Sequence, residues 1–226
     1  PEKFNQQFSI SNPKEDLSEI LKQRLGIEPG DITDIILTHL HFDHVGGLGK
    51  GDSGLEPVFK NANIHVHQKH YEYALKPTLR DSGSFQSHFF EPLLKYYMDK
   101  GQLNFLTSEK GPIFDEEDCK VEYKCSFGHT PYMIHPIFEE KIYMADLVPM
   151  SHHIKLPWVM GYDIEPGITT VYKKSFYDYI IKNKLTMIFE HDIKIWGGNL
   201  EVNEKNQYQL TKPCISNGEK TELLED

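Results

Sequence analysis

The feature that most restricts the fold of this chain is the segment 38–47, Thr-His-Leu-His-Phe-Asp-His-Val-Gly-Gly, which directly follows an apolar run. The run 32–38 is short and rich in β-branched residues, and it predicts a buried strand. Because side chains alternate along an extended chain, His39 and His41 project to the same side. Two imidazoles in this arrangement are within reach of one metal ion.

The next two donors, Asp43 and His44, fall where the chain turns toward a helix and can address a second ion beside the first. Histidine and carboxylate without thiolate suit zinc, manganese or iron. The alternative is a polar junction between strand and loop whose histidines only form hydrogen bonds. Four donors within six residues after an apolar strand favour metal binding over that alternative.

Three later positions repeat the pattern of a donor just beyond an apolar extended run: His129, Asp146 and His191. Strand ends gather at one edge of a sheet, so these side chains can meet the first segment there. The two oxygens of Asp146 each offer lone pairs, and this residue could bridge two cations. Each position alone fits a structural role, whereas the whole set gives seven metal donors.

The remaining pattern alternates strands and helices and predicts a layered α/β or α+β domain. A helix starts at Ser11–Asn12 before Pro13 and ends at Gly26. We expect one domain over residues 1–226, with an acidic tail at 216–226. Further strands are expected at 63–67, 103–107, 120–127 and 185–189, a hairpin at 134–138 and 141–145, and helices at 68–76, 87–100 and 169–184.

Composition argues against several classes of function. The net charge is −10 and only two of the 24 basic residues, Arg24 and Arg80, are arginine, so nucleic acid and anionic membrane surfaces are poor partners. No apolar run approaches the ~20 residues of a membrane span. Three cysteines without ligand-like spacing, Cys119, Cys125 and Cys214, indicate reduced thiols, and the expected compartment is the cytoplasm.

With these donors in place, residues 32–192 resemble the metallo-β-lactamase-fold superfamily of metallohydrolases, whose signature is His-x-His-x-Asp-His followed by His, Asp and His. The resemblance implies a four-layer αββα sandwich with metals at one edge of two sheets. It also implies two divalent ions, zinc first, with manganese, iron or cobalt as alternatives. One ion would take His39, His41 and His129, the other Asp43, His44 and His191, with Asp146 bridging.

Within the superfamily, the sequences 146–149 and 156–163 resemble the branch of quorum-quenching-lactonase-like and organophosphate-hydrolase-like enzymes. Two positions depart from this pattern. Tyr132 stands where family members usually have the glycine of His-Thr-Pro-Gly-His, and the next histidine is His135. Pro149 stands where well-known acyl-homoserine lactonases have tyrosine, so a tyrosine-assisted mechanism is not expected.

The expected reaction is hydrolysis of a small ester, lactone or related substrate. Metal coordination lowers the pKa of water from ~15.7 toward ~7, and the resulting hydroxide is the expected nucleophile. Asp43 is the expected catalytic proton acceptor. His152, Trp158 and Tyr162 are candidates for the substrate pocket. The alternative for His152 is a solvated loop, and the alternative for Trp158 and Tyr162 is a homodimer interface.

Two alternatives remain at this stage: a phosphodiesterase, nuclease or organophosphate hydrolase of the same fold, and a silent metal-binding domain. The negative charge disfavours the nuclease, and the complete donor set disfavours the silent domain. His65, His67 and His70 have ligand-like spacing, but strand alternation followed by a helix start explains them structurally. Only 38 residues precede His39, so we expect the first strands of the family fold to be absent from this numbering.

Overall fold

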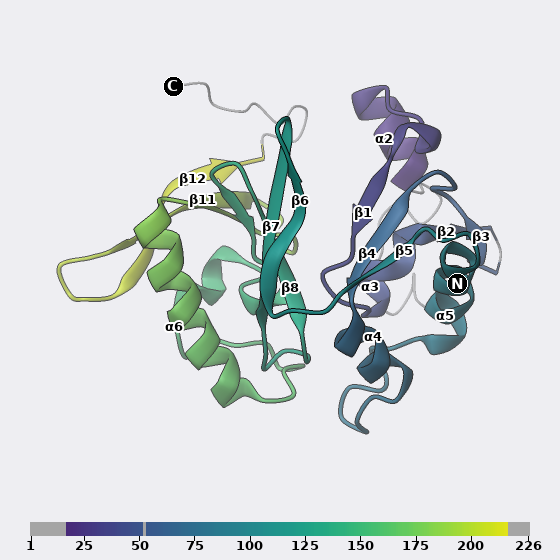
Figure 1. Cartoon of the computed structure of the whole chain (residues 1–226). Coiled ribbons are helices and arrows are strands. Elements are labelled where there is room, and N and C mark those ends of the chain that lie inside the picture. The colour runs from purple at the N-terminus through teal and green to yellow at the C-terminus, as the bar shows by residue number, and fades with distance from the viewer. Residues whose placement is uncertain (1–16, 52, 217–226) are drawn as a thin grey trace. The chain divides into compact units, whose positions relative to one another are not determined.

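The computed structural model describes residues 17–51 and 53–216. The chain divides into two compact units, Pro1–Thr107 and Ser108–Asp226, which Figure 1 colours purple to blue and teal to yellow. The expected helix start at Ser11–Pro13 and the tail from residue 217 onward lie outside the described residues. No helix in the described part of the chain has the length and apolar character needed to cross a membrane.

The first unit contains a parallel sheet in the order β1-β4-β5. Helix α5 packs on it through Phe90, Leu93, Leu94 and Tyr97, a spacing that places all four on one helical face. The strands of this sheet are β1 (Asp34–Ile36), β4 (Asn63–His67) and β5 (Leu103–Leu106). The short strands β2 (Gly49–Lys50) and β3 (Glu56–Pro57) form a separate ladder. The helices are α2 (Leu17–Leu25), α3 (Phe42–Val45), α4 (Gln68–Leu75) and α5 (Ser87–Asp99), and the 3₁₀ turns are η1 (Pro29–Asp31) and η2 (Gly46–Leu48).

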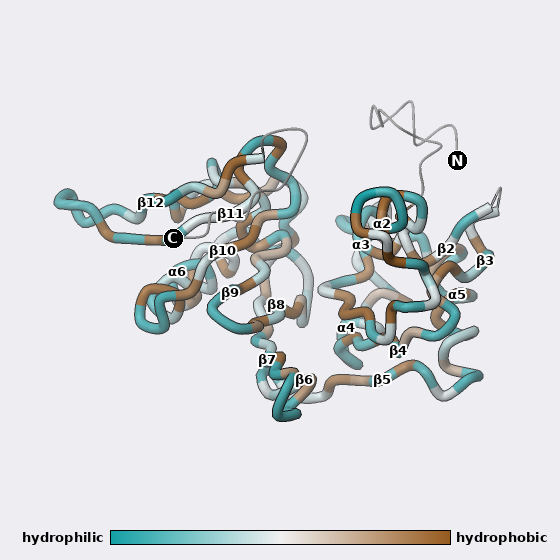
Figure 2. The backbone as a smooth tube through the Cα atoms, turned by 90° about the horizontal axis from the view of Figure 1, so that it is seen from above, coloured by the Kyte–Doolittle hydropathy of each residue, from teal (hydrophilic) through white to brown (hydrophobic). Residues whose placement is uncertain are grey.

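The structure corrects the expected strand 32–38 and shows how far helix α2 is covered. Strand β1 is shorter than residues 32–38 and half-buried rather than buried, because it forms one edge of the sheet among the described residues. The apolar stripe of α2 is only partly covered: Leu21 packs on the core, whereas Leu25 is 66% exposed. Figure 2 accordingly shows both hydrophobic and hydrophilic stretches on this helix.

The second unit contains a seven-stranded mixed sheet in the order β12-β11-β10-β9-β8-β7-β6. All neighbouring pairs are antiparallel except β9 and β10, which are parallel. The elements are β6 (Lys110–Glu116), β7 (Cys119–Ser126), β8 (Met133–Phe138), β9 (Lys141–Tyr143), β10 (Thr186–Ile188), β11 (Ile195–Val202), β12 (Tyr208–Ile215), α6 (Pro166–Asn183), and the 3₁₀ turns η3 (Ala145–Leu147) and η4 (Ser151–Ile154).

Helix α6 covers this sheet (Figure 1). Its buried face carries Phe176, Tyr177 and Ile180, which belong to one apolar cluster with Ile142 of β9 and Met187 of β10. Strands β6, β11 and β12 were not predicted from the sequence. The turn between β11 and β12 is hydrophilic, as Figure 2 shows. The mixed α/β class is confirmed, and the predicted elements end within three residues of the observed ones.

Candidate metal centre

The first group of predicted donors lies where β1 leads into α3. His39 and His41 are buried, their ring centroids are 4.6 Å apart, and their ligand nitrogens lie within 4.8 Å of one another. The His44 ring lies 3.9 Å from that of His39. Asp43 is more exposed, and its Oδ2 is 3.7 Å from His44 Nε2. We call these four residues the first cluster.

Local hydrogen bonds fix this cluster. The Thr38 hydroxyl lies 3.0 Å from His39 Nδ1, which leaves Nε2 as the nitrogen suited to a metal. The backbone N–H groups of His44 and Val45 both donate to the carbonyl of His41, so that His41 begins the short helix α3. The strand and the helix start therefore place imidazole side chains next to each other, as the spacing predicts.

Two of the three other histidines with ligand-like spacing, His65 and His70, have structural contacts. His65 Nε2 lies 2.8 Å from Asp34 Oδ1 on the neighbouring strand β1. His70 Nε2 accepts a hydrogen bond of 2.8 Å from the backbone N–H of Leu40, inside the first cluster's own loop. These contacts agree with the structural interpretation of His65 and His70.

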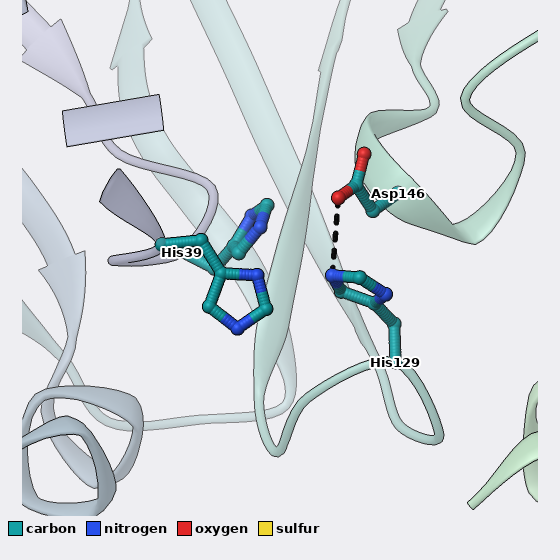
Figure 3. A group of neighbouring side chains, drawn as sticks. His39, His129 and Asp146 are labelled. Carbon is teal, nitrogen blue, oxygen red and sulfur yellow. Dashed lines mark ion pairs between the residues drawn. The ribbon is translucent and has the colours of Figure 1, made fainter. Parts of the chain in front are cut away.

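The second unit holds its own group of donors. Asp146 Oδ2 lies 3.0 Å from His129 Nε2, the ion pair drawn in Figure 3, and Asp146 Oδ1 lies 3.2 Å from His191 Nε2. Each carboxylate oxygen thus faces a different imidazole. Glu190 joins this group, because its ligand oxygen lies within 4.8 Å of those of Asp146 and His191. We call these four residues the second cluster.

Each predicted member of the second cluster follows a strand end: His129 comes after β7, Asp146 after β9 and His191 after β10. Asp146 lies in η3 directly after Ala145, whose φ of 42° is a left-handed conformation. His191 is held by its backbone N–H, which donates to the carbonyl of Pro149 at 3.1 Å.

Asp163, which was not predicted from the sequence as a site residue, orients His129. Its Oδ1 lies 2.9 Å from His129 Nδ1, and both side chains are buried. Burial would lower the pKa of His129, but hydrogen bonds to Asp146 and Asp163 and their charges outweigh burial and raise this pKa to about 9. Two carboxylates therefore stabilise a positive charge at this imidazole. A carboxylate behind a histidine is a frequent partner of metal-binding histidines.

Glu190 and Asp192, on either side of His191, were also not predicted. The Tyr143 hydroxyl donates a hydrogen bond to Glu190 Oε2. Burial raises the pKa of Tyr143, and the negative charge of Glu190 raises it further. Asp192 accepts hydrogen bonds from the backbone and hydroxyl of Ser151 at 3.0 and 2.6 Å. Such bonds overcome the opposing effect of burial and lower the Asp192 pKa to about 2. The Phe-Glu-His-Asp sequence offered one signal, namely two carboxylates beside a histidine.

The chemistry of both clusters fits divalent cations of borderline hardness. Their donors are imidazole nitrogens and carboxylate oxygens. The three cysteines lie elsewhere, Cys119 and Cys125 in β7 and Cys214 in β12. Zinc, manganese and iron accept such ligands. The two oxygens of Asp146 already face two separate imidazoles, which is the arrangement a bridging carboxylate needs.

Along the chain, the three predicted pocket residues follow Asp146 and precede helix α6. His152 is in η4 and exposed, and the side chains of Trp158 and Tyr162 are 49% and 68% exposed. Their exposure leaves them available to a substrate or to another subunit, and their role stays a prediction.

A protein-family model described as the metallo-beta-lactamase superfamily matches residues 9–191. An N-acyl homoserine lactonase of Bacillus thuringiensis is 42% identical over 188 residues, which are 80% of this chain and 64% of that enzyme. A probable metal-dependent hydrolase from Staphylococcus aureus superposes with a TM-score of 0.75 and 21% identity, covering 94% of this chain and 73% of that one. A dizinc quorum-quenching lactonase gives a TM-score of 0.68 and 20% identity, covering 86% and 68%.

The chain spans less than two thirds of the length of the curated relatives it matches. The likeness to the solved structures shows the fold. The family model covers most of the described residues, including all four members of the first cluster and His129, Asp146 and His191 of the second. The chain therefore belongs to the metallo-beta-lactamase superfamily.

Proposed function

We propose that this chain carries the active site of a dinuclear metal-dependent hydrolase that opens a lactone ring. The observation that carries the proposal is Asp146, whose two oxygens lie 3.0 and 3.2 Å from the imidazoles of His129 and His191. A carboxylate placed in this way can bind two ions at once. Membership of the superfamily supports the pairing of this residue with the His-x-His-x-Asp-His segment.

In this proposal both units belong to one domain over residues 1–226, and the two clusters together bind two metal ions. The first ion is bound by His39, His41 and His129. The second is bound by Asp43, His44 and His191, with Asp146 as the bridge. Zinc is the proposed metal, supported by the dizinc lactonase of the same fold and by the imidazole and carboxylate donors.

Bound divalent ions supply Lewis acidity and lower the pKa of a coordinated water. The protein's own side chains then have distinct tasks. Asp163 fixes the ring of His129 through Nδ1, so that Nε2 points toward Asp146. Asp43, the most exposed member of the first cluster, would accept a proton from the nucleophile and return it to the departing oxygen of the ring. Tyr143 holds Glu190 beside His191.

The proposed substrate class is the N-acyl homoserine lactones, which the names of the curated relatives give as their substrates. A lactone is neutral and small, and it suits a site in which two aspartates partly neutralise two divalent ions. The pocket would include His152, Trp158 and Tyr162. We further propose a cytoplasmic protein, since all three cysteines are free thiols, and a homodimer through the exposed aromatic side chains.

A substrate panel with the metal-loaded protein tests this function. We expect hydrolysis of an N-acyl homoserine lactone, loss of activity on chelation, and recovery with Zn²⁺ or Mn²⁺. Asp146→Asn should reduce bound metal from about two ions per chain and abolish turnover, because a neutral amide is a poor bridge between two cations. Asp34→Asn is the matched control, since the Asp34 carboxylate contacts the structural His65 in β4 and Asp34 belongs to neither cluster.

Several outcomes would contradict the proposal. Activity that survives chelation would exclude metal-dependent hydrolysis. Preference for phosphotriesters or cyclic nucleotides over lactones would favour an organophosphate hydrolase or a phosphodiesterase of the same fold. A purified protein that holds no metal after loading would favour a silent domain.

A further inference from the structure

Lys173 of helix α6 is a fully buried cation that the proposed chemistry does not use. Its Nζ donates hydrogen bonds to four backbone carbonyls: that of His153, those of Lys155 and Trp158 at 2.8 Å each, and that of Leu156 at 3.4 Å. An ammonium group has three N–H donors, so the longest contact shares a donor with another. The carbonyl oxygens form a cage around the charge.

The cage belongs to a single stretch of chain, residues 153–158, which we call the caged segment. Tyr177, one turn further along α6, donates its hydroxyl to the carbonyl of Ile154 at 2.9 Å. The carbonyls of five residues in the caged segment are therefore turned toward two side chains of α6. A buried charge is costly unless it is hydrogen-bonded, so this conformation of the segment and the ammonium depend on each other.

The caged segment carries Trp158, one of the three residues of the proposed pocket. The Trp158 ring is half-exposed, and Lys155 Nζ lies 4.5 Å above its centroid. The segment lies between Asp146 and Asp163, which contact the two nitrogens of His129. The backbone conformation of the caged segment therefore sets the position of the Trp158 ring. The segment belongs to the stretch of chain that joins Asp146 to Asp163.

We infer that Lys173 is a positioning residue: its ammonium fills a cation site made by the backbone carbonyls of residues 153–158, fixes Trp158 and thereby sets substrate specificity. This inference rests on the proposed function for its last step. The carbonyl cage itself is independent of the metal, because none of its members belongs to either cluster. Asp163 is the carboxylate whose charge opposes the effect of burial on the Lys173 pKa.

The first test compares Lys173→Met with Lys174→Met, a matched control on the same helix. Met has a similar length and no charge, while Lys174 is exposed and pairs with Asp178 at 2.8 Å. Hydrogen exchange should accelerate about tenfold or more at the amides of His153 and Trp158, because a charge-assisted hydrogen bond is lost from their segment. In a Trp196→Phe background, acrylamide should quench the remaining Trp158 more strongly.

The second test is chemical rescue, which remains informative if Lys173→Met folds poorly. Lys173→Ala removes three methylenes and the ammonium, the atoms of n-propylammonium. Adding n-propylammonium should restore slow exchange at the caged segment. Neither 1-propanol, which has the size but no charge, nor tetramethylammonium, which has the charge but no N–H donor, should do so.

Kinetics with an N-acyl homoserine lactone test the link to specificity. We expect Lys173→Met to lower kcat/KM about tenfold, mainly through KM, with unchanged metal content and with recovery of KM by n-propylammonium in Lys173→Ala. Unchanged hydrogen exchange in both Lys173→Met and Lys173→Ala would overturn the cation site, and so would restoration of slow exchange by 1-propanol. Faster exchange with unchanged KM for short-chain and long-chain lactones would overturn the role in specificity. If no lactone is hydrolysed by the unaltered protein, the proposed function fails while exchange and quenching still decide the cage.

Discussion

Replacing Gly128 by alanine should destabilise this protein more than an ordinary substitution of glycine in a loop. Gly128 precedes His129 and has a φ of +112°, a conformation that L residues rarely adopt. A Cβ at this position would lie 2.4 Å from both the backbone nitrogen and the Oγ1 of Thr169, and 2.7 Å from its Cα. Backbone atoms at the start of α6 therefore occupy the space that a methyl group needs.

The loop cannot easily move away, because the Glu165 N–H donates to the carbonyl of Gly128 at 2.8 Å. Strain at such a φ costs about 1–3 kcal/mol, and a forced methyl group in a packed region costs a similar amount. We expect Gly128→Ala to lower the free energy of unfolding by about 2–6 kcal/mol. Bound metal should fall as well, since the shift displaces His129.

Urea unfolding of the metal-free protein, followed by circular dichroism, measures this effect against two controls. Gly101→Ala introduces strain alone, because its φ is +70° and nothing lies within 4 Å of the added Cβ, and it should cost about 1–2 kcal/mol. Gly161→Ala has open space and no positive φ, and should change stability by less than about 0.5 kcal/mol. If Gly128→Ala costs no more than Gly101→Ala, the argument from the clash with α6 is wrong.

Three further predictions concern the second cluster. Asp163→Asn keeps an acceptor but removes the charge behind His129, so metal affinity should fall about 10–100-fold in competition with a chromophoric chelator; an unchanged affinity would contradict the positioning role. Ala145 has a φ of 42° and a buried side chain, so a larger, β-branched residue is strained there. Ala145→Val should lower the free energy of unfolding by about 2–4 kcal/mol, whereas Ala145→Gly should change it by less than about 1 kcal/mol. Thermal unfolding measures both effects. In metal-free protein the His129 pKa is raised from 6.5 to about 9, so its contribution to stability is complete below pH 6.5 and declines above it. Urea unfolding should show this decline in the free energy of unfolding from pH 6.5 to 8. Above about pH 8 Lys173 has the opposite effect, because its pKa is lowered from 10.5 to about 8 in the folded protein.

The residues of the site that the sequence predicted are those with a local signal. His39, His41 and His44 lie within six residues after an apolar run, and their spacing places the rings together in the folded chain. Asp163 had no such signal, because its partner His129 lies 34 positions earlier and only the fold brings the two together. Glu190 was hidden by its neighbour His191, whose strand-end position already explained the local pattern.

Proline and glycine explain why three strands of the second sheet were not predicted. Strands β6 and β12 form the two edges of the second sheet among the described residues, and each contains a proline, Pro112 and Pro213. Proline is compatible with an edge strand, where one row of N–H groups has no partner strand, but it weakens a sequence-based strand prediction. Strand β11 contains Gly197, where a Cβ would lie 2.5 Å from the carbonyl oxygen of Met187. The glycine that hides this strand from pattern analysis is needed for its pairing with β10.

Tyr132, at the position where the sequence pattern of the family has glycine, lies in the loop that carries His129. Its φ of 55° is left-handed, the region that glycine adopts at no steric cost. Holding a tyrosine there costs about 1–2 kcal/mol, and an edge-to-face contact with Phe127, with ring centroids 4.7 Å apart, returns about 0.5–1.5 kcal/mol. Phe127 in turn contacts Tyr172 of α6 at 5.2 Å. The aromatic contacts nearly offset the backbone strain, so this loop, in which His129 lies beside Asp146, can hold a tyrosine in a left-handed conformation.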